Sequence, residues 1–315
     1  MISFLEFEKP IAALEARIAE LRATADDSAI DIAGEIGKLE KKSAAMLAST
    51  YAKLTPWQKT QVARHPQRPH FVDYVRMAFT DFVPLGGDRL YGEDAAIIGG
   101  FATLNGRKVM LIGHEKGHDT TTRIKHNFGM AKPEGYRKAI RLMEMASKFG
   151  LPVVTLVDTA GAFPGVEAEE RGQAEAIARS TEACLALKVP MVAAIVGEGG
   201  SGGAVALASA NRVLMLEHAI YSVISPEGAS SILWRTADKA SDAATAMKVT
   251  AQDLLDLKVI DGIVAEPVGG AQRDPAAMAA ALAKALDREL ANLVPLSPEH
   301  LVRQREERFL AIGSL

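Results

Sequence analysis

The sequence predicts an α/β fold in which neighbouring strands are largely parallel. Three consecutive segments share one design, an apolar run followed by a glycine-containing loop and then a helical stretch, and they cover residues 151–187, 189–210 and 212–234. Apolar runs without polar alternation are typical of strands buried on both faces. Strand, loop and helix repeated in this order indicate a parallel sheet covered by helices.

Composition excludes several functional classes. With 48% apolar and 24% charged residues, the 315-residue chain resembles a soluble globular protein, and its net charge of −3 argues against binding nucleic acid or membranes through bulk charge. The single cysteine, Cys184, excludes an internal disulfide and a Cys-rich zinc ribbon. The first residues are too acidic for a signal peptide, and no run approaches the ~18 apolar residues of a membrane span. We therefore expect a cytoplasmic protein without membrane contact.

Residues 1–50 have the pattern of two amphipathic helices. Apolar residues recur at spacings of three and four, first at Ile11, Leu14, Ile18 and Leu21 and again at Ile32, Ile36 and Leu39. Pro10 suits the first turn of the first helix, and the polar cluster 26–28 interrupts the pattern. We expect a helical hairpin that serves as a packing arm, and a main domain that covers 51–315.

Turn signals and aromatic residues occupy the stretch from Thr55 to about residue 90. Residues 95–117 hold two β-rich runs around Asn105-Gly106, a strong hairpin signal. A helix is predicted over 133–149, with proline at its start and Gly150 after its end.

The C-terminal 50 residues predict two helices. An alanine-rich helix covers about 275–290. The charged segment 303–309 follows as a helical tail, and its many charges predict a solvated face.

The glycine-rich segment 197–204, GEGGSGGA, is the densest signal for chemistry. Glycine lets the backbone approach a ligand closely, and a helix start leaves N–H groups unpaired. These groups and the helix dipole stabilise negative charge, so the loop suits a phosphate or an oxyanion. A structural alternative is that the glycines only allow tight packing of helix on strand.

Two rival motifs overlap in this segment. Gly197, Gly199 and Gly202 form G-x-G-x-x-G, the dinucleotide-binding fingerprint, with Glu217 as its acidic residue. The pattern G-x-S-x-G, a nucleophile elbow, is formed at 199–203 around Ser201, and its triad partners would be Asp238 and His300. Short glycine patterns arise easily by chance, so the loop alone does not decide between these readings and an oxyanion hole.

A second glycine loop, DTAGAFPG at 158–165, favours the oxyanion hole. Two loops on successive strands can direct N–H donors at one oxygen from two sides. Asp158 is expected to cap its loop, and Arg171 to pair either with a ligand anion or with a neighbouring glutamate. The turn 223–228, VISPEG, predicts a helix start at Pro226. His114 and His118 are four residues apart but lie around Gly117, a poor setting for a metal site.

Several long stretches resemble the carboxyltransferase alpha subunits of bacterial acetyl-coenzyme A carboxylase. They are FLEFEKPI (4–11), ARHPQRP (63–69), NFGMAKPEGYRKA (127–139), DTAGAFPGVEAEERGQAEAIAR (158–179), VGEGGSGGAVALA (196–208) and YSVISPEGASSILW (221–234). The resemblance extends to about Arg273 without obvious gaps. It departs from the family's usual DTPGAYPG at Ala160 and Phe163, which replace a proline and a tyrosine.

The resemblance implies a crotonase-like (ClpP/crotonase) spiral of ββα repeats with an N-terminal helical hairpin. It also implies an ATP-dependent complex for fatty acid biosynthesis, in which this subunit pairs with a beta subunit as an α₂β₂ assembly. The beta subunit would bind acetyl-coenzyme A and carry zinc. This subunit would receive carboxybiotin on the biotin carboxyl carrier protein, which biotin carboxylase supplies, and would hold no covalent biotin itself.

The resemblance also assigns the site. Backbone N–H groups of Gly202 and Gly203 would form the oxyanion hole for the ureido oxygen of biotin, and the product would be malonyl-coenzyme A. Further substrate-binding positions would be Gly199, Gly200, Ser201, Gly161 and Ala162. No side-chain nucleophile and no metal would be needed from this chain.

Other functions remain open at this point. A stand-alone crotonase-type hydratase or isomerase would use Glu198 as its acid/base. A carboxyltransferase for another acyl-coenzyme A and a non-catalytic scaffold are further alternatives.

Overall fold

An eight-stranded mixed sheet forms the centre of the molecule, and the computed structural model describes residues 2–25 and 33–313. The sheet order is β1 (Thr80–Pro84), β2 (Ile97–Leu104), β3 (Arg107–His114), β4 (Val153–Thr159), β5 (Met191–Gly200), β6 (Arg212–Leu216) and β8 (Gly262–Val264), with β7 (Ile220–Ser222) paired to β5. The first three strands are antiparallel, and from β3 onward every pair is parallel. The predicted α/β class with largely parallel neighbours is confirmed.

The hairpin between β2 and β3 forms where the sequence places it. Leu104 pairs with Arg107, and the two residues between them, Asn105 and Gly106, have φ values of 47° and 81°. Positive φ at both central residues defines the turn that matches the twist of a two-residue hairpin.

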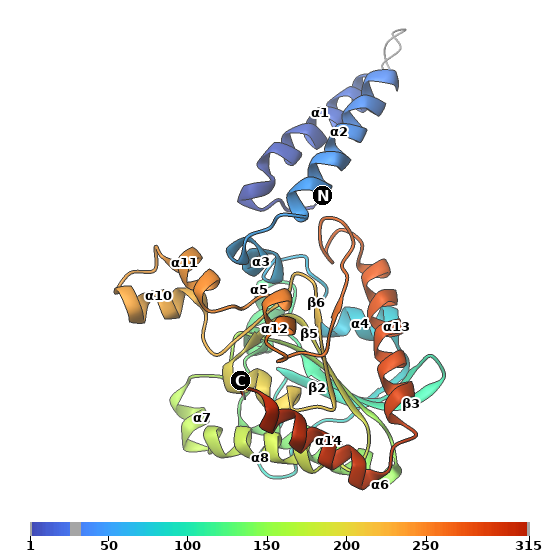
Figure 1. The fold of residues 1–315 in the computed structure, drawn as a ribbon, viewed down its shortest axis with the longest axis vertical. Coiled ribbons are helices and arrows are strands. Elements are labelled where there is room, and N and C mark those ends of the chain that lie inside the picture. The colour runs from blue at the N-terminus through green and yellow to red at the C-terminus, as the bar shows by residue number, and fades with distance from the viewer. Residues whose placement is uncertain (1, 26–32, 314–315) are drawn as a thin grey trace.

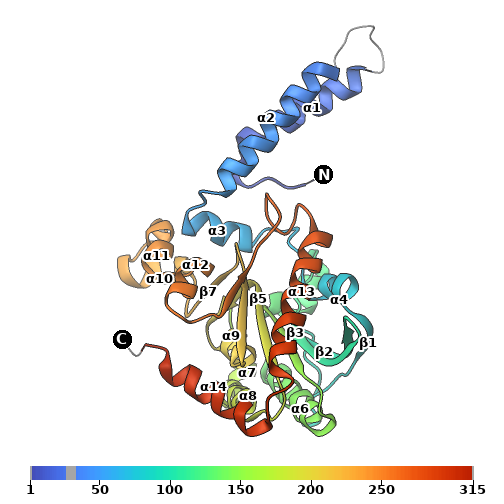
Figure 2. The ribbon, with the colours of Figure 1, turned by 45° about the vertical axis from the view of Figure 1, so that its right-hand side comes forward.

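Helices cover the sheet in two groups. Helix α6 (Pro133–Phe149) packs on β2 and β3, α9 (Ser201–Ala208) packs on β4 and β5, and α8 (Gln173–Ala186) lies outside both. Helices α4 (Phe71–Ala78) and α13 (Pro275–Leu293) pack on each other and form a separate group (Figure 2). All residues of β4 and β5 are buried. The thiol of Cys184 on α8 lies in this core, 3.6 Å from the Met143 sulfur.

The remaining elements connect these layers. They are η1 (Glu6–Glu8), α3 (Pro56–Ala63), α5 (Thr120–Lys125), η2 (Asn127–Gly129), α7 (Val166–Glu170), α10 (Pro226–Trp234), α11 (Ala240–Ala246), α12 (Ala251–Asp256) and α14 (Pro298–Ala311). The predicted helix start at Pro226 is confirmed, because Ser225 caps α10 by accepting a hydrogen bond from the Gly228 N–H at 3.0 Å. None of the helices in the described part of the chain is long and apolar enough to cross a bilayer.

Strand β5 changes partners along its length. Residues 192–195 pair with β6, whereas residues 198–200 pair with β7. Gly199 makes the second pairing possible, because a Cβ there would lie 2.7 Å from the Tyr221 ring. The end of β5 therefore separates from β6 and leads into the first turn of α9.

Two helix predictions need correction. The helical stretch expected after the glycine loop 158–165 is broken into α7 and α8 by Gly172, whose φ of 81° no regular helix contains. The solvated face expected for the tail helix α14 is present at Arg303, Glu306 and Glu307, which are exposed, but Arg305 within it is fully buried. Its guanidinium donates hydrogen bonds to the carbonyl oxygens of Leu185 and Val189 and to the Asn211 side chain, which replaces water as its partner.

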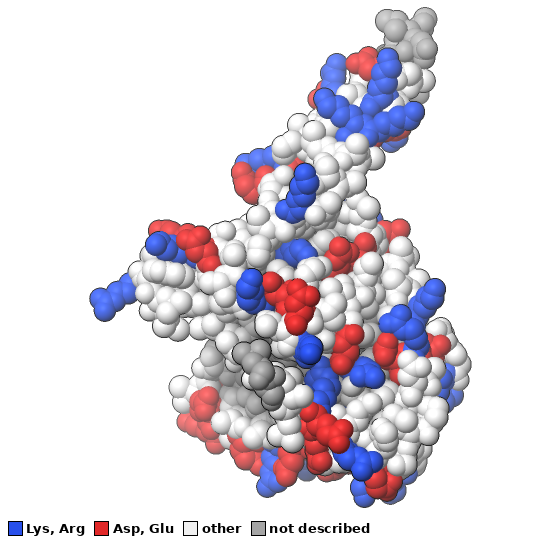
Figure 3. Space-filling model, viewed as in Figure 1, with Lys and Arg blue, Asp and Glu red and all other residues white. Residues whose placement is uncertain are grey.

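The N-terminal helices form the expected hairpin, which projects from the body (Figure 1). Helix α1 (Lys9–Ala25) packs against α2 (Ala33–Tyr51), and the predicted interruption at 26–28 lies outside the described residues, as does Ile32. The division of the chain into an arm of 1–50 and a domain of 51–315 stays a prediction. Figure 3 shows Lys and Arg gathered toward the outer end of the arm, whereas both signs are interspersed over this face of the body.

Candidate active site

The two glycine loops touch each other, backbone against backbone. A Cβ on Gly200 would lie 2.2 Å from the Ala160 carbonyl oxygen, and a Cβ on Gly203 would lie 2.8 Å from the Gly161 carbonyl carbon and 2.9 Å from the Ala162 nitrogen. Such approaches exclude any side chain. The loop after β4 and the start of α9 after β5 therefore form one continuous glycine-lined surface.

Backbone N–H groups are available on this surface. The Gly161 N–H donates to the Thr159 hydroxyl at 3.1 Å, whereas the Ala162 N–H has no hydrogen-bond partner among the described residues. Gly202 and Gly203 lie in the first turn of α9, where N–H groups have no partner within the helix. Ala162, Gly202 and Gly203 are thus the donors that could stabilise an oxyanion here.

The nucleophile-elbow reading is not supported by the geometry. Ser201 is exposed and has the positive φ of 50°, but its hydroxyl has no hydrogen-bond partner within residues 2–25 and 33–313. Asp238 accepts instead from Thr236 at 2.9 Å, and His300 lies on the exposed first turn of α14. The structure does not bring the three residues together as a triad.

The glycines of the G-x-G-x-x-G pattern do not form the turn of a dinucleotide-binding site. Gly197 and Gly199 lie within strand β5 rather than in a turn at its end. Gly197 is glycine because of Asp158, since a Cβ there would lie 2.3 Å from the Asp158 Oδ1. Glu217, the expected ribose ligand, accepts a hydrogen bond from the Glu266 N–H at 3.1 Å.

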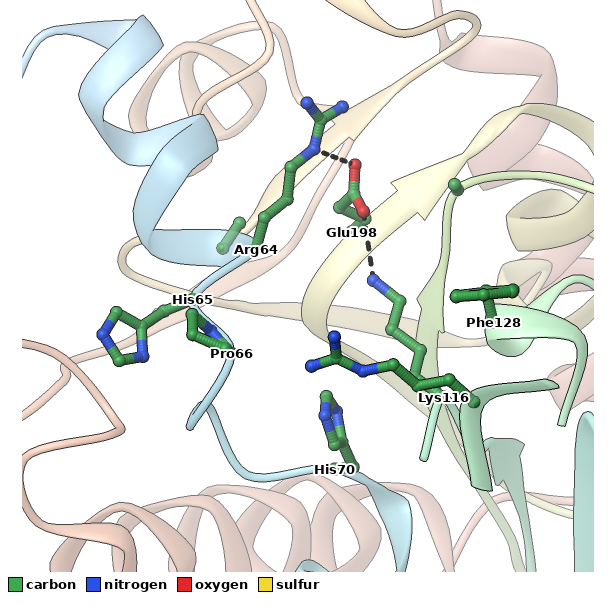
Figure 4. Close-up of a pocket in the computed structure, with 10 residues that line it drawn as sticks. Arg64, His65, Pro66, His70, Lys116, Phe128 and Glu198 are labelled. Atoms are coloured by element: carbon green, nitrogen blue, oxygen red, sulfur yellow. Dashed lines mark hydrogen bonds and ion pairs between the residues drawn. The ribbon is translucent and has the colours of Figure 1, made fainter. Parts of the chain in front are cut away.

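Alternating charges form a chain next to the two glycine loops, and Figure 4 shows its members Arg64, Glu198, Lys116 and His70. Arg64 donates to Glu198 at 2.6 Å, and Lys116 bridges Glu198 at 3.0 Å and Asp158 at 2.7 Å. The Nδ1 of His70 lies 3.4 Å from Asp158 at the far end of the chain. Because residues 64 and 70 lie between α3 and α4 while residues 116, 158 and 198 come from three other segments, sequence reasoning did not group them.

The charged forms are stabilised in this chain. Burial alone would raise the pKa of Asp158, but the Lys116 ammonium and His70 outweigh it and hold that pKa well below its usual range. Burial likewise opposes ionisation of Glu198, and Lys116 with Arg64 lowers its pKa nonetheless. A glutamate held ionised by two cations is a poor proton donor. Glu198 therefore does not fit the acid/base role that a stand-alone hydratase requires.

The Asp158 side chain connects strand β4 to strand β5 and does not cap the loop that follows it. Its Oδ1 accepts a hydrogen bond from the Glu198 N–H at 2.9 Å, so the ends of β4 and β5 are joined next to the glycine loops. The expectation that Asp158 caps its own loop is replaced by this contact. Arg171 pairs with Glu134 of α6 at 2.5 Å, not with a neighbouring glutamate.

Two hollows adjoin the glycine surface. One has a volume of about 590 Å³ and is largely apolar, with Gly202, Val205, Tyr221 and Met247 among its lining residues. The other has a volume of about 230 Å³ and contains the charged chain together with Ala160 of the first loop.

The family model described as acetyl co-enzyme A carboxylase carboxyltransferase-like matches residues 4–313. The chain belongs to this carboxyltransferase family. A protein of Erythrobacter litoralis named acetyl-coenzyme A carboxylase carboxyl transferase subunit alpha is 76% identical over 99% of this chain and 100% of its own length. The protein of the same name from Zymomonas mobilis is 64% identical over 99% of this chain and 100% of its own.

Solved structures of other carboxyltransferases share the fold. Transcarboxylase 12S superimposes with a TM-score of 0.57 and 20% identity over 71% of this chain and 42% of its own. The geranyl-CoA carboxylase beta subunit of P. aeruginosa superimposes with a TM-score of 0.55 and 19% identity over 78% of this chain and 46% of its own. The predicted crotonase-like fold is confirmed.

The departures from the usual family loop have defined surroundings. Ala160 lines the smaller hollow, and the Phe163 ring lies 4.6 Å below the Lys132 ammonium. Neither residue supplies the free N–H of the loop, which belongs to Ala162.

The two histidines considered for metal binding have separate environments. His114 is buried, whereas His118 is partly exposed and contacts Asp73 at 3.0 Å. Within the described ranges, no three His, Cys, Asp or Glu side chains are grouped as a metal site.

Proposed function

We propose that this chain is the alpha-type subunit of a biotin-dependent carboxyltransferase that acts on acetyl-coenzyme A. The relatives named for this activity match it over 99% of its length, and this is the observation that carries the proposal. The product would be malonyl-coenzyme A, the precursor for fatty acid synthesis.

The glycine surface fits the proposed chemistry. Carboxybiotin supplies the carboxyl group, and negative charge develops on its ureido oxygen as the group leaves. The N–H groups of Gly202 and Gly203 would hold this oxygen, with the Ala162 N–H beside them. The apolar hollow beside Gly202 suits an uncharged ring. The donors act only where charge develops, so the mechanism needs no nucleophile from this chain.

The proposed partners follow from the same relatives. A beta subunit would complete an α₂β₂ assembly, bind acetyl-coenzyme A and carry zinc. The biotin carboxyl carrier protein would bring carboxybiotin from biotin carboxylase. Gly199, Gly200, Ser201 and Gly161 would shape the substrate surface around the three donors.

The reverse reaction tests this function. We expect malonyl-coenzyme A to be decarboxylated in the presence of biocytin only when this chain and its beta subunit are combined. A folded, associated pair without this activity would contradict the proposal. Hydration of crotonyl-coenzyme A by this chain alone would favour the stand-alone hydratase instead.

A further inference from the structure

The smaller hollow next to the glycine loops has the properties of a ligand site. We call it the basic pocket, and its lining residues are Ala63, Arg64, His65, Pro66, His70, Lys116, Arg123, Phe128, Ala160 and Glu198. Its volume of about 230 Å³ suits a group of a few heavy atoms. Figure 4 shows the side chains of Arg64 and Lys116 on either side of Glu198, with His70 below Lys116.

His70 provides the first evidence for a ligand. The residue is only 6% exposed, and its Nε2 has no hydrogen-bond partner among the described residues. A buried ring nitrogen without a partner is costly, and such groups in native proteins usually have a function. In Figure 4 the His70 ring lies below Lys116 and Glu198, and it is one of the lining residues of the pocket.

The balance of donors and acceptors indicates what the ligand must offer. Both oxygens of Glu198 are engaged, one by Arg64 and the other by Lys116. Arg123 makes one long contact, from its Nε to the Gly117 carbonyl oxygen at 3.4 Å, and so keeps most of its five N–H donors. The pocket therefore has free N–H donors on Arg123, while both carboxylate oxygens of Glu198 are already bonded. A ligand with oxygen acceptors would fit this arrangement.

The mouth of the pocket is formed by a strained segment. Asn127, Phe128 and Gly129 have consecutive φ values of 47°, 55° and 78°, and the Phe128 side chain is half exposed. Non-glycine residues in this region cost free energy and cluster at ligand sites. The strained backbone keeps the Phe128 ring half exposed beside the pocket, although a phenylalanine ring is usually buried.

We propose that the basic pocket binds the carboxylate of the transferred group as it stands on the malonyl product. This inference rests on the proposed function. Ala160 lines the pocket and directly precedes the Gly161–Ala162 segment, so a carboxylate held there lies beside the oxyanion donors. Arg123 would bind it through paired N–H groups.

Charge favours a carboxylate over a phosphate. The pocket has three cations, Arg64, Lys116 and Arg123, and the first two pair with the carboxylates of Asp158, Glu198 and Glu227. These six formal charges cancel, so a doubly charged group would meet no excess of positive charge. A singly charged, planar carboxylate matches the paired donors of one arginine.

The first test is a calorimetric titration of the full-length chain with malonate, whose second carboxylate can remain in solvent outside the pocket. We expect malonate to bind and its uncharged analogue malonamide not to bind. Arg123→Gln should weaken malonate binding about tenfold, as the loss of a charge-assisted pair predicts. Lys125→Gln is the matched control, because it removes the same charge from an exposed position on the same helix. Equal effects of both variants, or tighter binding of inorganic phosphate than of malonate, would overturn the proposal.

Kinetics of the reconstituted pair give the second test. Arg123→Gln should raise KM for malonyl-coenzyme A and leave KM for acetyl-coenzyme A unchanged, since only the former carries the carboxylate. An equal rise in both would contradict a carboxylate subsite. If the pair is inactive while the chain still binds malonate, the proposed function fails and the pocket assignment stands. If the pair is active and malonate does not bind, the pocket assignment fails alone.

Discussion

Neighbouring residues of the glycine surface differ in what they can tolerate. Ser201 is exposed and its hydroxyl has no hydrogen-bond partner in the described part of the chain, whereas Gly203 lies against the backbone of the first loop. We expect Gly203→Ala to abolish carboxyl transfer, because a Cβ 2.8 Å from the Gly161 carbonyl carbon forces the loops apart. Ser201→Ala should keep most activity. The rate of malonyl-coenzyme A decarboxylation measures both.

A β-branched residue at Gly202 is expected to abolish activity as well. Its Cβ would lie 3.3 Å from the Ile177 side chain, and its branches would enter the space in front of the donors. Full loss in Ser201→Ala with mild loss at Gly202 would instead favour a serine hydrolase.

His114 makes stability depend on pH. Burial lowers its pKa from 6.5 to about 4, and the nearby Asp158 and Lys116 act on it in opposite directions. Between these values the unfolded chain binds a proton that the folded chain does not, so stability falls as the pH falls. From pH 7 to pH 5 the loss should be about 2 kcal/mol, since one pKa unit is worth about 1.4 kcal/mol.

Urea unfolding at both pH values measures this loss. His114→Leu should remove this contribution, whereas the lowered pKa values of His65 and His218 add to the remaining pH dependence. His300→Gln, at an exposed position, should leave it unchanged. An unaltered pH dependence in His114→Leu would show that another group is responsible.

At the residue scale, sequence predicted the glycines better than the charges. The glycine loops follow apolar strands directly, so their meeting could be expected from the order of elements alone. No sequence pattern marks Arg64 and Lys116 as site residues. Only their ion pairs with Glu198 and Asp158, which are distant in the sequence, place them in the site. Asp158 and Glu198 lie at the ends of apolar strands, where burial is expected. A buried carboxylate needs a cation as its partner, so their positions were the one sequence signal for cations from other segments.

At the scale of elements, helix α14 is held to the body by a buried cation. Arg305 is fully buried and donates to the carbonyl oxygens of Leu185 and Val189, and the Asn211 side chain joins it to the start of β6. Arg305→Ala should reduce the free energy of unfolding by about 2–4 kcal/mol, through lost hydrogen bonds to a charged group and lost packing.

The exposed Arg303 on the same helix is the matched control. Arg303→Ala should change stability by less than about 0.5 kcal/mol in the same denaturation experiment. Similar losses in the two variants would mean that charge on the helix, rather than the buried contact, is what matters.

Element boundaries failed where tertiary contacts override local pattern. The segment 166–186 has helical composition throughout, and only the left-handed conformation of Gly172 divides it. The segment 212–222 was predicted as one unit but divides into β6 and β7, and the second strand pairs with the end of β5. The charged tail predicted a solvated helix because composition does not show which face meets the core.

At the scale of the whole molecule, the arm is joined to the body by few contacts. Arg273 lies 2.8 Å from Glu15 and 3.6 Å from the buried Glu8, which accepts a hydrogen bond from Tyr51 at 3.1 Å. Removing the cation leaves Glu8 buried without a charge partner. Arg273→Met should therefore speed amide hydrogen exchange in α1 and leave α13 unchanged, as mass spectrometry can measure.

Equal acceleration in both helices would show that Arg273 supports the body rather than the arm. Arg288→Met is a suitable control, because this exposed arginine pairs only with its neighbour Glu289 among the described residues.

The overall architecture was the most predictable level. Three strand–loop–helix units in succession leave few arrangements other than a parallel sheet, and the hairpin at 105–106 fixes its antiparallel extension. The sequence alone did not show that an apolar and a charged hollow lie beside one glycine surface. That arrangement depends on the change of partner along β5, from β6 to β7.

The buried thiol of Cys184 can report the rate at which the core of the protein opens. Burial raises its pKa to about 12, so the reactive thiolate is essentially absent while the core stays closed. As the chain has one cysteine, each molecule can be alkylated once, and only after α8 has separated from α6 and α9. The alkylation half-life in excess iodoacetamide therefore reports the opening of the core, without any label having to be engineered.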